Sequence, residues 1–223
     1  IKYYVVEGDA FNDITPIRAT TTGAATFSVA NGATIATVTD STHGAVLGDF
    51  VTFSDAASLG GNVTAAILNQ EYEIVSVPTT STYTINLSVT GNASDSGNGG
   101  GSTVAAYQID CGLDTQVGGT GWGSGTWGRS TWGSSFGLGV ATELALWNED
   151  NFGEDLLLNL RDGGVYYWDK SGGLAARAVN LVDGDNANNA PMIAKQVMVS
   201  DNSRHVIAFG TNTIDTCLLY TSP

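Results

Sequence analysis

Short runs of β-branched and aromatic residues recur along this chain, and turn-forming residues separate them. In a stretch otherwise rich in Thr, Ala, Ser, Val and Gly, such runs occupy residues 25–29, 33–39, 49–54, 71–77 and 82–89. Val, Ile, Thr and aromatic side chains favour pleated strands, whereas Gly, Asn and Asp favour the turns between them. The pattern therefore predicts an all-β protein built from short strands.

The composition agrees with this fold class. Hydrophobic residues make up 42% of the chain, but charged residues only 13%, about half the usual ~25%. The net charge of −14, from 22 acidic and 8 basic residues, leaves few side chains to neutralise phosphates, so ordinary DNA or RNA binding is not expected. A cationic partner or Ca²⁺ fits this charge better. No apolar run is long enough to span a membrane, and the first residues lack the pattern of a signal peptide.

We divide the 223 residues into four parts. Residues 1–18 are expected to form the first strands of a propeller-like body, with Pro16 at an edge or a strand start. Residues 19–102 are expected to form an inserted small β-barrel or sandwich module, and residues 103–213 to continue the body. Because the chain lacks a starting Met and "TIDTCLLYTSP" follows a completed strand, we expect a fragment whose residues 214–223 are a non-native tail.

Three local features of the expected module concern a turn, its final loop and one strand. Asn31-Gly32 fits a two-residue hairpin turn, in which both residues need positive φ. The stretch "GNASDSGNGGGST" at the end of the module has the composition of a flexible linker or a long loop tip. The run "DFVTFS" places Val51 and Phe53 on one face of a strand and Phe50 and Thr52 on the other.

Consecutive antiparallel hairpins are predicted after the module. Strand signals occupy residues 102–110, 142–148, 155–162, 164–170, 195–200 and 204–210. Turn signals at 151–153, 162–164 and 201–202 join them, and Trp and Tyr lie near the strand ends. Hairpins of this kind are typical of the blades of a β-propeller. The sequence contains at most two such blade-like units.

Catalytic chemistry finds little support in the residues. The chain has two histidines, His43 and His205, and neither lies in a nucleophile-elbow pattern, so both are interpreted as surface or strand-end residues. Pairs of carboxylates that could hydrolyse a glycoside are available, but scattered acidic residues are expected in so acidic a chain. These pairs are Asp110 with Asp114, Glu149 with Asp150, and Glu154 with Asp155. We expect no enzyme activity and no cofactor.

A metal site is a further candidate. The stretch "DGDNANN" supplies the oxygen ligands of a weak Ca²⁺ candidate, formed by Asp183, Asp185, Asn186 and Asn188. The spacing lacks the Gly and the distant Glu of an EF-hand loop. A solvated turn is the favoured interpretation, because Asp and Asn side chains bond to their own backbone in turns. The chain has two cysteines, Cys111 and Cys217. We do not expect them to form a structural disulfide.

The stretch "GWGSGTWGRSTWG" spaces Trp122, Trp127 and Trp132 evenly, five residues apart. An odd spacing sends successive side chains to opposite faces of a strand, so one strand cannot present all three as a platform. Each indole could instead fill a groove, with the following Gly permitting a turn. We favour a role of these tryptophans in structural packing or a subunit interface. Stacking on a glycan is the alternative.

Several segments together resemble virion proteins of marine tailed phages. The segments are "YYVVEGDAFNDITPIR", "ATVTDSTHGAVLGDFVTFSDAASLGGNVTAAILNQEYEIVSV", "GWGSGTWGRSTWG" and "LWNEDNFGEDLLLNLRDGGVYYWD". Those virion proteins look like the tail nozzle proteins of short-tailed phages, also called tail tubular or packaged-DNA stabilisation proteins. The strongest parts are Asp13–Arg18 and Asn151–Leu156, and neither is a catalytic signature.

The resemblance implies a β-propeller body with inserted β modules, assembled with copies of itself as a ring below the portal and adaptor. Such a protein is made in the host cytoplasm and resides in the virion tail. It contacts other tail proteins and passes DNA without binding it specifically. The chain is shorter than a whole propeller requires. The alternatives are an adhesin that binds a host surface glycan or receptor, and a virion hydrolase.

Overall fold

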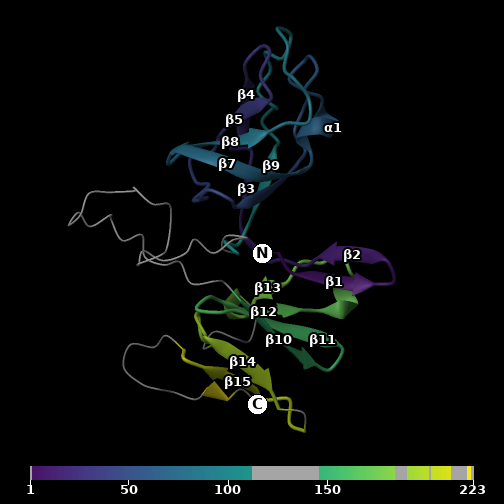
Figure 1. The fold of residues 1–223 in the computed structure, drawn as a ribbon, viewed down its shortest axis with the longest axis vertical. Helices are drawn as coiled ribbons and strands as arrows, with labels where there is room; N and C mark the ends of the chain where they lie inside the picture. The colour runs from purple at the N-terminus through teal and green to yellow at the C-terminus, as the bar shows by residue number, and fades with distance from the viewer. Residues whose placement is uncertain (1, 112–145, 184–189, 201, 212–219, 222–223) are drawn as a thin grey trace, which may run out of the picture.

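The computed structural model describes residues 2–111, 146–183, 190–200, 202–211 and 220–221 (Figure 1). These residues confirm the all-β prediction, because their strands form four antiparallel sheets. Helical structure in the described ranges is limited to short elements. These are the helix α1 (Ala65–Leu68) and two 3₁₀ turns, η1 (Lys170–Gly172) and η2 (Leu181–Asp183).

The largest sheet has seven strands, and we call it the seven-stranded unit. Its strands are β3 (Ile17–Thr22), β4 (Thr26–Val29), β5 (Ile35–Thr39), β6 (Phe50–Ser54), β7 (Glu71–Thr79), β8 (Thr82–Asn86) and β9 (Val104–Gln108). They are hydrogen-bonded in the order β3-β9-β6-β7-β8-β5-β4. The first residues of β7 pair with β6 and the later ones with β8, across register shifts at Ile74 and Ser76. Strand β7 therefore connects β6 and its neighbours to β8 and its neighbours. The sheet curls into a half-barrel around one core.

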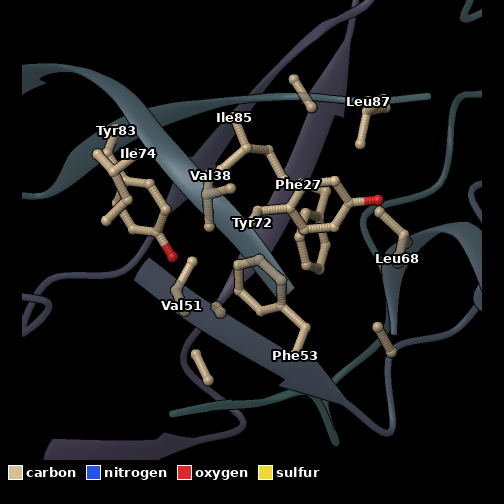
Figure 2. Close-up of a cluster of buried hydrophobic side chains, with 14 of the residues drawn as sticks. Phe27, Val38, Val51, Phe53, Leu68, Tyr72, Ile74, Tyr83, Ile85 and Leu87 are labelled. Carbon is tan, nitrogen blue, oxygen red and sulfur yellow. The ribbon is translucent and has the colours of Figure 1, made fainter. Parts of the chain in front are cut away.

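The core of this unit follows from strict alternation along its strands. Val51 and Phe53 share one face of β6, as the sequence predicts, and this face points inward, while Thr52 lies on the other. Figure 2 shows them meeting aromatic and aliphatic side chains from the neighbouring strands. The rings of Phe27 and Phe53 meet edge to face with centroids 4.9 Å apart. Burying each such side chain contributes about 1.5 to 3 kcal/mol.

The Gly/Ser/Asn-rich stretch near residue 95 lies in the long loop between β8 and β9 and is bound to the unit, so the alternative of a flexible linker is wrong. The Asp95 carboxylate accepts backbone N–H groups of Gly61, Asn62, Val63 and Asn92. Further along, the Phe27 N–H donates to the Asn98 carbonyl at 3.0 Å and the Ala57 N–H to the Gly99 carbonyl at 2.7 Å. Gly99 has φ +86 and lies against the Phe27 ring. The glycines here permit close packing against the core.

The predicted two-residue turn at Asn31-Gly32 is also wrong. Only Gly32 of this pair has positive φ, at +82, and the strands end at Val29 and resume at Ile35. The Ala33 N–H donates to the Ala30 carbonyl at 3.0 Å, which closes a four-residue turn. A positive φ at the third position of such a turn matches a type II turn within a longer loop.

The strand predicted at 102–110 as a resumption of the body belongs instead to the seven-stranded unit. Strand β9 pairs with both β3 and β6. The Ile109 N–H then donates to the Pro16 carbonyl at 3.1 Å, immediately below the unit. The two connections to the rest of the protein therefore lie side by side, as Figure 1 shows.

The other three sheets are small and antiparallel. The first is the ribbon of β1 (Tyr4–Glu7) and β2 (Ala10–Asp13). The second has β10 (Trp147–Phe152), β11 (Asp155–Leu160), β12 (Val165–Trp168) and β13 (Val179–Asn180) in sequence order. The third has β14 (Gln196–Val199), β15 (Val206–Phe209) and the two-residue β16 (Tyr220–Thr221). The turn after β10 falls at Gly153, so this strand includes residues 151–152, which were predicted as a turn.

These three sheets are stacked, with the four-stranded sheet between the other two. Leu158 and Leu160 of β11 lie in one core with Ile14, which directly follows the ribbon. Leu157, on the opposite face of β11, lies in a second core with Val197 and Ala208 of the third sheet. Both faces of the four-stranded sheet are therefore covered, which explains why β11 is apolar on successive residues.

Candidate functional site

The sequence-predicted aromatic and metal-binding residues fall mostly outside the described ranges. Trp122, Trp127 and Trp132 all do, and so do Asp185, Asn186 and Asn188. Asp183 is described, as an exposed residue at the end of η2. Within the described residues, no group of three or more His, Cys, Asp or Glu side chains could hold a metal ion. No described helix is both long and apolar enough for a membrane span.

His43 is buried, contrary to the prediction of a surface or strand-end position. It is 1% exposed, and its Nδ1 accepts the Ala45 N–H at 3.0 Å. Its ring packs edge to face on Tyr83, 5.1 Å between centroids. The buried His43 ring therefore has a packing role in the seven-stranded unit. His205 is half-buried, and its carbonyl accepts the Ser200 N–H at 2.9 Å within the β14–β15 connection.

The carboxylates named as hydrolytic candidates take structural roles where they are described. Asp150 on β10 accepts the Val199 N–H at 2.7 Å, and Asn148 accepts the Val197 N–H at 2.9 Å. These two side chains join the second sheet to the third. Glu149 lies near the Tyr3 hydroxyl, and burial followed by this carboxylate raises the pKa of Tyr3 to about 12. Asp114, the partner predicted for Asp110, lies outside the described residues.

Glu154 and Asp155 line a groove of about 580 Å³ at the turn between β10 and β11. The groove is lined by Phe152, Glu154, Asp155, Tyr167, Asp169, Lys170, Ser171 and Arg204. It gathers two aromatic rings, three carboxylates and two cations on one surface. The sequence pattern indicated only the two carboxylates at this turn, because most of the other lining residues come from β12, the start of η1 and the loop before β15.

Hydrogen bonds fix the carboxylate at the centre of this groove. Asp155 accepts the Tyr167 hydroxyl through one oxygen and the Lys170 N–H at 3.0 Å through the other. The bond to Asp155 is the main cause that raises the pKa of Tyr167 to about 12. Both oxygens of Asp155 are thus engaged and Tyr167 stays protonated at neutral pH. This arrangement fixes the orientation of the Asp155 carboxylate and the Tyr167 ring on the surface of the groove.

An arginine, a third carboxylate and two aromatic rings form the rest of the groove. The Arg204 guanidinium lies over Gly153, where a Cβ atom would be 3.3 Å from it. The Asp169 side chain accepts the Ser171 N–H at 2.7 Å at the start of η1. The Ser171 hydroxyl, followed by this N–H, lowers the pKa of Asp169. The Phe152 and Tyr167 rings meet nearly perpendicular with centroids 6.2 Å apart. Aromatic rings beside fixed charges can contact both the apolar and polar sides of a sugar.

A second polar group, which we call the junction cluster, connects the seven-stranded unit to the stacked sheets. It consists of Lys2, Asp13, Glu71, Gln108 and Arg177. Arg177 lies 2.8 Å from Asp13 and 3.6 Å from Glu71, and Lys2 contacts the same two carboxylates. Burial of Asp13 would raise its pKa, but hydrogen bonds from Thr15 and the nearby cations lower it overall. All five side chains hold the two parts of the molecule together.

Comparison with known proteins finds weak similarity to solved structures. No family model matches the chain, and no curated protein matches it. Among solved structures, the phage phi92 endosialidase is similar over 87% of this chain and 28% of its own, with 12% identity and a TM-score of 0.32. The chain thus spans less than a third of that protein's length. A similarity at this level carries no argument about fold or activity.

Proposed function

We propose that this chain is a non-enzymatic structural protein of a phage tail, forming part of the ring that retains packaged DNA and conducts it on ejection. The observation that carries the proposal is the stack of three antiparallel sheets with a separate β unit inserted between the first and second. In a β-propeller each blade is a small antiparallel sheet, and successive blades pack face to face in chain order. This agrees with the resemblance of the sequence segments to tail nozzle proteins.

The charge supports passage of DNA without retention. The chain carries 22 acidic and 8 basic residues. Several of the basic side chains already contact carboxylates, including Lys2, Arg177, Lys170 and Lys195. Few cations are left to neutralise a phosphate backbone, and the acidic excess repels it. A ring with such a surface allows DNA to slide.

A structural role is also favoured by what the described acidic residues do. Asp95, Asp150 and Asp155 accept backbone N–H groups, and Asp13 lies in the junction cluster. These carboxylates stabilise loops and the contacts between sheets, which is a structural role.

Localisation tests the proposal. Antibodies against the purified chain should label the tail of virions that contain it, at the end away from the capsid. In filter binding at low salt, the chain should retain no duplex DNA, and it should release no reducing ends from host polysaccharide. Labelling confined to the capsid, or tight DNA retention, would contradict the proposed role.

The groove near Asp155 favours a second candidate, an adhesin that binds a host surface glycan. The test is retention of the chain on immobilised host glycans, with Tyr167→Ala for the groove and Trp127→Ala for the tryptophan stretch. Tyr4→Ala, which changes an exposed Tyr on the ribbon, is the matched control. Retention lost only with the first or second variant supports the adhesin, and no retention by the unmodified chain removes it.

A further inference from the structure

The loop between β14 and β15 holds an arginine in a backbone conformation that arginine rarely adopts. Arg204 has φ +52, in the left-handed region that favours Gly or Asn because a larger side chain is crowded there. The Arg204 N–H donates to the Ser200 carbonyl at 2.7 Å, and the Ser200 N–H to the His205 carbonyl at 2.9 Å, so hydrogen bonds close the loop around it. A long charged side chain at a position that favours glycine points to a role for the side chain.

The Arg204 side chain lies against the turn between β10 and β11. Phe152 pairs with Asp155, which leaves Gly153 and Glu154 as a two-residue turn, and φ +80 at Gly153 fits a type II′ hairpin turn. A Cβ atom on Gly153 would lie 3.3 Å from each of Cζ, Nη1 and Nη2 of Arg204. Equal distances to these three atoms place Gly153 over the face of the planar guanidinium. The N–H edges of the group are therefore directed away from Gly153.

Arg204 has no hydrogen bond or ion pair through its guanidinium among the described residues, although three carboxylates line the same groove. Those carboxylates have other partners. Both oxygens of Asp155 accept hydrogen bonds, and Asp169 accepts an N–H at the start of η1. Glu154 lies 3.6 Å from Lys170. The groove therefore contains one oriented cation whose N–H donors are available to a ligand.

We infer that this groove binds an acidic glycan, with a sugar carboxylate on the Arg204 guanidinium and a sugar ring against Phe152 and Tyr167. The planar guanidinium matches a carboxylate through two parallel N–H···O bonds. The two aromatic rings, with centroids 6.2 Å apart, supply the apolar contact that a ligand site needs beside its few polar groups. The inference goes beyond the tail role, and it deepens the adhesin candidate, on which it rests.

The acidic charge of the chain opposes such a ligand, but mainly at long range. The net charge is −14, and salt at physiological strength screens exposed charges beyond about 8 Å. Repulsion of this kind slows the encounter of ligand and protein. The contact itself depends on hydrogen bonds between charged groups, which are about twice as strong as neutral ones. The nearest opposing charges are Asp155 and Asp169, and they make a cationic sugar the competing ligand.

NMR titration of the full chain with three tetrasaccharides tests the inference. The acidic probe is a tetrasaccharide of galacturonic acid, the neutral probe is its methyl ester, and the cationic probe is a tetrasaccharide of glucosamine. The acidic probe should bind about tenfold or more tightly than the ester, which has the same rings without the charge. The backbone signals that shift on binding should include those of Tyr167 and Arg204.

Variants of Arg204 separate binding from packing. Arg204→Gln should weaken binding of the acidic probe about tenfold or more and leave binding of the ester unchanged. Arg161→Gln is the matched control, since it removes an exposed arginine just beyond the far end of β11, outside the groove. Arg204→Gly should unfold at no lower temperature than the unmodified chain, because Gly suits φ +52, and yet lose the preference for the acidic probe.

Other outcomes overturn the inference. These are equal affinity for the acidic probe and its ester, tighter binding of the glucosamine probe, an equal loss in Arg161→Gln, or an unchanged preference in Arg204→Gly. Inorganic phosphate that competes as well as the acidic probe would also overturn it, because the sugar would then add nothing. The outcomes separate the proposals. Binding of both sugars alike would leave the adhesin candidate and remove this inference, whereas acid-selective binding without tail labelling would remove the tail role alone.

Discussion

The Tyr107 hydroxyl on β9 donates a hydrogen bond to the Asp40 carboxylate at 2.7 Å, inside the core of the seven-stranded unit. Asp40 is fully buried. It also accepts the Thr21 hydroxyl at 2.5 Å and the Thr42 N–H at 3.1 Å. The Tyr83 hydroxyl extends the chain of bonds, 3.0 Å from that of Tyr107. One carboxylate thus connects β3, β8, β9 and the loop after β5.

Removing the Tyr107 hydroxyl should destabilise the chain more than removing the Tyr83 hydroxyl. Tyr107→Phe loses a bond to a charged acceptor, which contributes about 1.5 to 3 kcal/mol, and Tyr83→Phe loses a neutral bond of about 0.5 to 1.5 kcal/mol. Urea unfolding measures both free energies. Equal losses in the two variants would show that the charge on Asp40 adds nothing.

The same carboxylate should make stability depend on pH. Burial of Asp40 would raise its pKa, but hydrogen bonds from Thr21, Thr42 and Tyr107 lower it overall. A lowered pKa in the folded state contributes stability above the unfolded value of about 3.9, and this contribution is lost as pH falls through the folded value. Asp40→Asn should therefore unfold at a lower temperature than the unmodified chain at pH 7. The difference should shrink toward pH 3, and a constant difference in calorimetry would contradict this.

The strands could be predicted from sequence because alternation and turn residues are local signals. The runs at 49–54 and 155–162 contain β6 and β11 as observed. The location of β9 was not predictable in this way, since its partners β3 and β6 lie far from it along the chain. The loop near Asp95 was misjudged for a related reason: glycines that suit a flexible linker also suit close packing on Phe27.

The candidate groove was only partly predictable. Glu154 and Asp155 stand out as adjacent acidic residues, but Tyr167 and Arg204 reach them through pairing of β11 with β12 and stacking of the third sheet. The burial of His43 depends likewise on Tyr83, which lies forty residues further along the chain. A hydrophobic pattern around a single histidine does not contain that contact.

Substitution of Gly99 tests how closely the Asp95 loop packs. Gly99→Ala should destabilise the chain because φ is +86 and the new Cβ would lie 2.5 Å from the Phe27 ring. Gly48→Ala is the matched control, with φ +87 and nothing within 4 Å. The control should lose about 1 kcal/mol from backbone strain, and Gly99→Ala a further 1 kcal/mol or more, about what overpacking costs. Thermal unfolding of both variants measures the difference, and equal losses would mean that the loop yields freely.

The junction cluster should set the orientation of the seven-stranded unit relative to the stacked sheets. Arg177→Gln removes contacts to Asp13 and Glu71, which come from the two different parts. It leaves two carboxylates close together with Lys2 as their remaining charged partner among the described residues. We expect a loss of about 1.5 to 3 kcal/mol and a broader distribution of intramolecular distances in small-angle X-ray scattering. Lys195→Gln, which breaks an exposed pair with Asp162 at 3.9 Å, should change neither. If Arg177→Gln leaves the scattering profile unchanged, Arg177 does not determine the orientation.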